Sequence, residues 1–212
     1  MNDYVWHSHV MLSDKPGTVP LRGINYHEDE RGKEYLEMLD AYEQGAPIQA
    51  ADLPSHVCFR RGQVRKQLNY LNAADLWVLN AEVAEIFRSF DLGAGGLYPV
   101  GLLGVDRKTP VEGEHYILVF GNRKDTIDYE KSKLRPGMDP RRLKPPEEGD
   151  DGKLVFKREA LRGPDIWLEE NLRRAVFFSG PLGDALKKAK KHSRFRIGKC
   201  SVQVGCPSFT GP

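Results

Sequence analysis

The feature that most constrains the fold is an apolar run that ends in a helix-capping residue and continues into an amphipathic helix. This arrangement occurs twice, as "LWVLN" ending at Asn80 and as "AVFFS" ending at Ser179. After each cap, apolar residues recur at the i, i+3, i+4, i+7 spacing of one helical face. They are Val83, Ile86, Phe87 and Phe90 in the first copy and Leu182, Ala185, Leu186 and Ala189 in the second. Each copy predicts a strand, a cap and a helix, and two copies are too few for a solenoid.

Ser179 also invites an interpretation as a nucleophile, because it precedes a glycine in "FFSGP". The GxSxG pattern is absent around it, however, and Asn80 occupies the matching position of the first copy. A hydroxyl at this place can accept a hydrogen bond from an N–H group of the first helical turn, and Pro181 stands where a missing N–H costs little. We therefore predict that Ser179 caps a helix.

The remainder of the chain predicts short strands, hairpins and helices without a regular alternation that would require a parallel sheet. "YVWHSHVML" reads as a first strand, and "LYPVGLLGVDRKTPVEGEHYILVFGN" reads as a hairpin. A short helix is expected from Glu34 to Gln44, and an exposed loop over residues 135–152, which contain four prolines. The fold class predicted is α+β, with a mixed or antiparallel sheet and a strand-cap-helix-strand pseudo-repeat. We expect a single domain over residues 1–212.

Two tryptophans are expected in the core. Trp77 and Trp167 each follow an Asp and a branched apolar residue at the entrance to an apolar run. Burial of an indole contributes several kcal/mol to a fold, so both are predicted to be inside.

The composition indicates a globular protein of a reducing compartment. Its 40% hydrophobic content is enough for a core, and 32 Lys and Arg nearly balance 30 Asp and Glu. Three cysteines without a CxxC pattern suggest no disulfide framework. The first residues lack the features of a signal peptide, and no stretch approaches the roughly 20 apolar residues of a membrane span. We expect a soluble, cytoplasmic protein with no membrane partner.

The C-terminal segment carries a basic cluster. Lys187, Lys188, Lys190 and Lys191 follow the polar side of the second helix near its C-terminal end, where cations are stabilised by the helix dipole. Together with Arg194, Arg196 and Lys199 they could also bind phosphates, although aromatic residues that would stack on bases are sparse here. A nucleic-acid-binding module that uses this basic segment is therefore the alternative function, while the solvated helix face is the simpler interpretation.

No catalytic or cofactor site is predicted. His7 and His9 share one face of the first strand, which suits a metal ion, but no spacing supplies a third ligand. The cysteines lack a zinc spacing, and neither a P-loop nor a Rossmann glycine pattern is present. We expect no metal, no cofactor and no enzymatic activity.

The order of these pieces resembles the bacterial immunity proteins of the eleventh Imm type, once catalogued as a domain of unknown function and encoded beside secreted polymorphic toxins. The resemblance rests on "ADLWVLNAEVAEIFRSF" with "GLYPV", on "HYILVFGNRKDTIDYEKS", and on "PDIWLEENLRRAVFFSGPLGDALKKAKKHSRFRI", and covers residues 70–198. The basic "KKHSR" replaces the family's small turn before the last strand. The resemblance implies an inhibitor that binds a cognate toxin encoded by a neighbouring gene.

Two acidic clusters are the predicted toxin contacts. Many toxins of such systems attack nucleic acid and need a basic cleft, which acidic groups of an inhibitor can match. The clusters lie in segments expected to be exposed and comprise Glu28, Asp29 and Glu30, and Glu147, Glu148, Asp150 and Asp151. If the toxin is not a nuclease, the basic segment from Lys187 to Lys199 is the better candidate.

Overall fold

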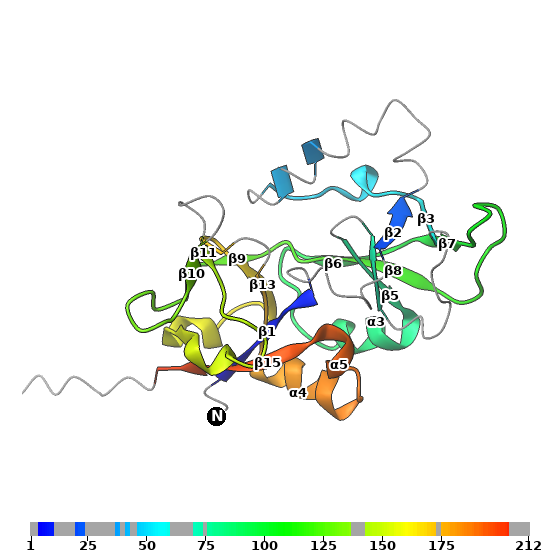
Figure 1. The fold of residues 1–212 in the computed structure, drawn as a ribbon. Helices are drawn as coiled ribbons and strands as arrows, with labels where there is room; N and C mark the ends of the chain where they lie inside the picture. The colour runs from blue at the N-terminus through cyan, green and yellow to red at the C-terminus, as the bar shows by residue number, and fades with distance from the viewer. Residues whose placement is uncertain are drawn as a thin grey trace, which may run out of the picture.

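The computed structural model of the protein contains two large sheets, a two-stranded sheet and several short helices, an α+β architecture that confirms the predicted class (Figure 1). The residues that it describes are 4–10, 20–23, 37–38, 41–42, 46–59, 70–73, 76–136, 143–172 and 175–203. Within the expected helix from Glu34 to Gln44, residues 37–38 and 41–42 are helical, and the others lie outside the described residues.

The six-stranded sheet has the order β12-β15-β1-β14-β13-β9. Its central four strands are antiparallel, whereas β12 and β9 add to its edges in parallel, so the sheet is mixed as predicted. β1 is therefore an interior strand of a sheet whose other strands all come from the C-terminal half of the chain. The bounds are β12 (Val155–Phe156), β15 (Ile197–Val202), β1 (Tyr4–Ser8), β14 (Val176–Ser179), β13 (Ile166–Glu169) and β9 (Arg123–Lys124).

The seven-stranded sheet has the order β6-β8-β5-β4-β2-β3-β7. The expected hairpin is present where β6 pairs antiparallel with β8, but the strand is interrupted at Val100, and β7, which follows it, pairs with β3. The bounds are β6 (Gly96–Pro99), β8 (His115–Val119), β5 (Leu76–Asn80), β4 (Tyr70–Ala73), β2 (Pro20–Gly23), β3 (His56–Cys58) and β7 (Gly101–Leu103).

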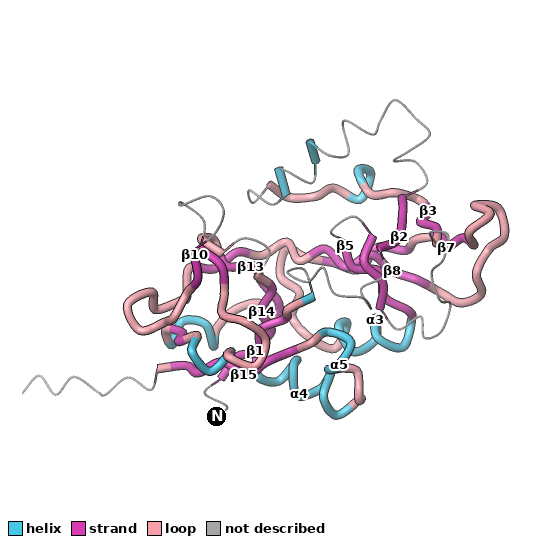
Figure 2. The backbone as a smooth tube through the Cα atoms, viewed as in Figure 1, coloured by secondary structure: helices cyan, strands magenta, loops and turns pink. Residues whose placement is uncertain are grey.

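Both predicted caps are present. The Asn80 side chain accepts a hydrogen bond from the Val83 N–H at 3.1 Å, and the Ser179 hydroxyl accepts one from the Leu182 N–H at 3.2 Å. Each cap ends a strand and begins a helix, and the helices lie close together with the short α5 (Figure 2). The helices that follow the caps are α3 (Ala81–Arg88) and α4 (Gly180–Lys188), with α5 at His192–Phe195.

The core has two parts, one on each face of the six-stranded sheet. Along β14, Phe178 packs into the cluster that also contains Trp77, while its neighbour Phe177 packs on the other face with Trp167. This alternation is the period of two expected of a strand. The Trp77 ring lies 4.9 Å from that of Phe120 and 6.1 Å from that of Phe178, so the two sheets share this cluster. Both predicted core tryptophans are fully buried.

The segment 135–152 is only in part the exposed loop that its prolines suggested. The short strands β10 (Arg135–Pro136) and β11 (Leu143–Lys144) pair there, and residues 137–142 lie outside the described residues. Pro145 and Pro146 are buried, while Glu147 and Glu148 are exposed. The segment ends in a 3-10 turn, η3 (Asp151–Lys153), whose first residue is buried.

Candidate functional site

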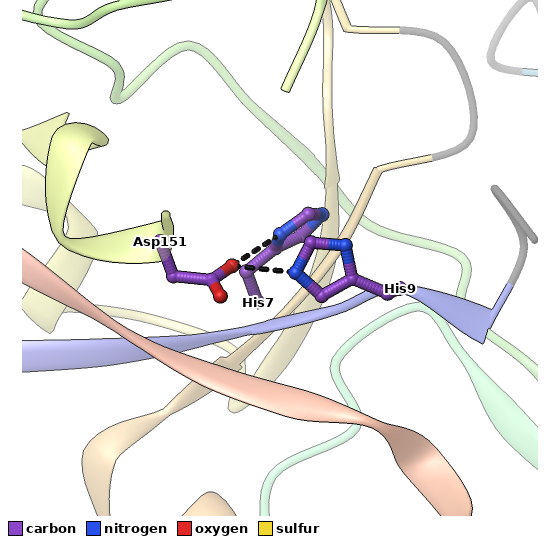
Figure 3. A group of neighbouring side chains, drawn as sticks. All are labelled: His7, His9 and Asp151. Carbon is purple, nitrogen blue, oxygen red and sulfur yellow. Dashed lines mark hydrogen bonds and ion pairs between the residues drawn. The ribbon is translucent and has the colours of Figure 1, made fainter. Parts of the chain in front are cut away.

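Two histidines and an aspartate converge at β1 and form a compact group of ionisable side chains in the described structure (Figure 3). His7 Nδ1 lies 2.9 Å and His9 Nε2 lies 2.7 Å from the same oxygen of Asp151, Oδ1. The three ligand atoms are all within 4.8 Å of one another. We call these three residues the His-His-Asp cluster.

Strand geometry places the two histidines together. Alternate residues of a strand point to the same side, so His7 of β1 and His9 just beyond its end face the same direction. The His9 N–H donates to the Arg196 carbonyl at 3.2 Å, which continues the pairing of β1 with β15 past Ser8. The aspartate reaches them from η3, more than 140 residues later in the chain.

A glycine makes room for the aspartate. Gly198 is the residue of β15 that pairs with His7, and a Cβ atom added to it would lie only 1.9 Å from Asp151 Oδ2. Any side chain at this position would therefore push the carboxylate away from the imidazoles. The second carboxylate oxygen also accepts a hydrogen bond from the Gly149 N–H at 3.3 Å.

The cluster is buried: His7 is 0%, His9 5% and Asp151 4% exposed. Burial lowers the pKa of His7 to about 4, against the opposing hydrogen bond to Asp151. Burial alone would raise the pKa of Asp151, but the hydrogen bonds from both imidazoles outweigh it and hold the pKa below its usual value. At neutral pH the cluster therefore contains an ionised carboxylate and a neutral His7.

These protonation states fix the direction of the His7 hydrogen bond. An ionised carboxylate can only accept, so the neutral His7 ring donates from Nδ1. Its other nitrogen, Nε2, is buried and has no hydrogen-bond partner among the described residues. The ring stacks on Phe177, with centroids 4.9 Å apart, which holds it in place.

A second buried carboxylate, that of Glu169 at the end of β13, is held by neutral hydrogen-bond donors rather than by imidazoles. Glu169 is fully buried and accepts hydrogen bonds from the Thr126 N–H at 3.0 and 3.1 Å, from the Thr126 hydroxyl, and from Trp167 Nε1 at 3.3 Å. Burial raises the pKa of this carboxyl above its usual value, although the hydrogen bonds oppose the rise. All of these donors are neutral, and none of them is a metal ligand of the usual kind.

The predicted toxin contacts divide into three groups. Glu28, Asp29 and Glu30 lie outside the described residues. Glu147 and Glu148 are exposed as expected and Asp150 is partly exposed. The expected exposure of Asp151 is wrong, because its carboxylate is drawn inward by the two imidazoles.

The exposed acids each form an ion pair with a cation of the same chain. Glu147 pairs with Arg135 at 2.9 Å, Glu148 pairs with Arg196, and Asp150 pairs with Lys153 at 2.7 Å. These ion pairs neutralise part of the charge of the acidic segment, and its carboxylates stay exposed to solvent.

Several cations of the basic segment also have partners in this chain. Lys191 pairs with Glu82 at 2.8 Å, and the Lys199 ammonium lies 3.6 Å from the centre of the Tyr4 ring. The ammonium of Lys187 lies 5.7 Å from the centre of the Trp6 ring. These contacts fit the interpretation of a solvated helix face and give no specific support to nucleic-acid binding.

Comparison with known proteins identifies the class. The fold and the cluster define an α+β protein whose N-terminal strand is held against its C-terminal half. The model of the Imm11 immunity protein family matches residues 10–199, so the chain belongs to this family. No curated protein matches the sequence. The described helices include none that is long and apolar enough to cross a membrane.

The match extends well beyond the residues 70–198 on which the resemblance rested, and it begins directly after His9. The sequence singled out His7 and His9 but supplied no third ligand. The third member of the cluster is Asp151, which no local spacing could reveal, because it follows the histidines by more than 140 residues and reaches them from η3.

Proposed function

We propose that this chain is a non-enzymatic inhibitor that binds a cognate secreted polymorphic toxin and neutralises it inside the bacterium that produces both. The observation that carries the proposal is the family match over residues 10–199, which includes both strand-cap-helix units. The toxin is expected to be encoded by a neighbouring gene.

The exposed acids of the segment before η3 are the proposed toxin contacts. Glu147 and Glu148 form ion pairs at the surface, and such pairs contribute only about 0.2 to 1 kcal/mol. A basic toxin surface can therefore replace Arg135 and Arg196 as partners of these carboxylates at small cost. The same charges would speed the encounter with a toxin whose cleft is built to bind phosphates, and a nuclease is one such toxin. Glu28, Asp29 and Glu30 remain predicted contacts with the same kind of basic toxin surface.

Co-expression tests the proposed function. The toxin domain encoded beside this gene is placed under an inducible promoter in a host that lacks the system, with or without this chain. We expect growth to stop when the toxin is induced alone and to continue when this chain is present. A catalytically inactive toxin domain controls for the burden of expression, and continued growth arrest despite abundant, folded inhibitor would contradict the proposal.

A further inference from the structure

We propose that the His-His-Asp cluster is a binding site for a divalent transition-metal ion of the zinc class. The inference starts from the donor set. Two imidazole nitrogens and one carboxylate oxygen are the ligand types that Zn²⁺ takes in proteins, and their atoms converge to within 4.8 Å of one another. Mg²⁺ and Ca²⁺ prefer shells of oxygen ligands, which this group does not provide.

Without an ion, the imidazoles and the carboxylate are linked directly by hydrogen bonds, and their donor atoms lie closer together than the ligands of a zinc ion do. Zinc holds its nitrogen and oxygen ligands at about 2.0 to 2.2 Å, so tetrahedral ligands lie roughly 3.3 to 3.5 Å from each other. The two nitrogens lie 2.9 and 2.7 Å from Asp151 Oδ1. Entry of an ion requires each imidazole to retreat by roughly half an ångström, which a rotation of the side chains can supply.

The charge of the cluster favours a cation. A carboxylate that is 4% exposed lies beside two buried imidazoles, whose nitrogens are 2.9 and 2.7 Å from its Oδ1. Removing a carboxylate from water is costly unless a positive charge compensates it, and a divalent ion bound to the carboxylate provides that charge. Neutral imidazole is also the form of histidine that binds metals.

Coordination through His7 Nδ1 moves the ring hydrogen to Nε2, the nitrogen that has no partner in the described structure. A buried, unpaired N–H is unfavourable, but its cost is small beside the binding free energy of structural zinc sites. The three protein ligands leave one coordination position for a water molecule. Because all three residues are buried, the ion would have a structural role and would join β1 to η3.

A metal ion bound to both β1 and η3 would also constrain the surface segment before η3. Asp151 directly follows the segment that carries Glu147 and Glu148, and β1 is an interior strand of the six-stranded sheet. An ion held by both elements would fix the position of this surface segment relative to the sheet. The metal site is inferred from the cluster alone and does not depend on the identity of any toxin.

Calorimetry with Zn²⁺ tests the site directly. The full chain, prepared without a histidine tag and stripped with a chelator, is titrated with Zn²⁺ and, in parallel, with Co²⁺, whose visible absorption reports tetrahedral coordination. We expect one tight site in the wild type and a rise of the unfolding temperature with Zn²⁺ concentration. His9→Gln keeps an N–H donor for Asp151 but removes the ligand, and it should weaken Zn²⁺ binding more than about 100-fold, beyond the loss caused by an outer-shell partner.

The exposed His56 supplies the matched control, since it lies on β3 and is not part of the cluster. His56→Gln should bind Zn²⁺ as the wild type does. A wild type without a tight site, or a folded His9→Gln variant with unchanged affinity, would overturn the proposal.

A measurement on the wild type alone covers the case in which His9→Gln does not fold. The chain has six histidines, and nuclear magnetic resonance of their ring nitrogens distinguishes them. Addition of one equivalent of Zn²⁺ must shift the rings of His7 and His9. If those two rings are unchanged, the proposal is wrong.

Discussion

Asp151 and Glu169 are both buried carboxylates, but the groups that hold them differ, and so do the directions of their pKa shifts. The Glu169 carboxylate accepts hydrogen bonds from the Thr126 N–H and hydroxyl and from the Trp167 ring N–H, and burial raises its pKa. The Asp151 carboxylate is hydrogen-bonded to two imidazoles, which more than offset the effect of burial and lower its pKa. At Glu169 the neutral donors leave burial the larger effect, whereas at Asp151 the hydrogen bonds from the two imidazoles outweigh burial and favour the charged carboxylate.

The largest effect is expected from Asp151→Ala. This change removes the acceptor of both histidines and leaves their ring nitrogens buried without a partner. Breaking a buried charged network by removing one member typically costs about 3 to 5 kcal/mol. Urea unfolding of chelator-treated protein measures the loss. The adjacent Asp150 is partly exposed and pairs with Lys153 at the surface, so Asp150→Ala should cost less than about 1 kcal/mol. Equal losses in the two variants would refute the assignment of Asp151 to the cluster.

Glu169→Gln should have a smaller effect. The amide oxygen can still accept one hydrogen bond from Thr126, but its NH₂ group then faces a second donor, so one buried donor loses its partner. We expect a loss of about 1 to 3 kcal/mol in the free energy of unfolding. Glu170→Gln, at the exposed neighbouring position, is the control and should change little. A Glu169→Gln variant as unstable as Asp151→Ala would remove the distinction between the two carboxylates.

The pH dependence sharpens the comparison. Because the pKa of Glu169 is raised from 4.5 on folding, the folded protein binds this proton more readily than the unfolded chain. Its contribution to stability is full below about pH 4.5 and is lost as the pH rises through the raised pKa. Urea unfolding of the wild type and of Glu169→Gln at several pH values between 4 and 8 measures this. The advantage of the wild type over the variant should shrink as the pH rises, and a growing advantage would show that the sign is wrong.

The smallest effect on stability is expected at the surface acids. Glu147→Gln with Glu148→Gln should change the free energy of unfolding by no more than about 1 kcal/mol per residue, because both side chains are exposed and each loses a surface ion pair. The same double variant should slow association with the cognate toxin and weaken the salt dependence of the rate. Glu159→Gln, an exposed acid on the separate 3-10 turn η4 (Arg158–Leu161), should leave the association rate unchanged. A double variant with the wild-type rate at low salt would take Glu147 and Glu148 out of the interface.

The features that the sequence predicted correctly depend on near neighbours. Asn80 and Ser179 each bond an N–H group three residues ahead, so the cap and the helix that follows can be read from one short stretch. These patterns suffice for the strand-cap-helix units and for the burial of Trp77 and Trp167.

The features that the sequence could not predict depend on distant pairing. Nothing near Asp151 indicates burial, since it follows prolines, glycines and other acids that are typical of an exposed loop. Its place is set by Gly198 of β15, which leaves space opposite His7. The interruption at Val100, after which β7 pairs with β3 rather than with β8, likewise depends on long-range strand pairing.

The chain belongs to the Imm11 family, and we propose that it inhibits a toxin by binding it. The most direct measurement titrates this purified chain into the purified toxin domain encoded by the neighbouring gene and follows both binding and the activity of that domain. We predict saturable binding and a parallel loss of toxin activity that is complete at saturation, with no effect on a toxin of an unrelated system. A toxin domain that stays fully active and unbound in excess of this folded chain would contradict the account.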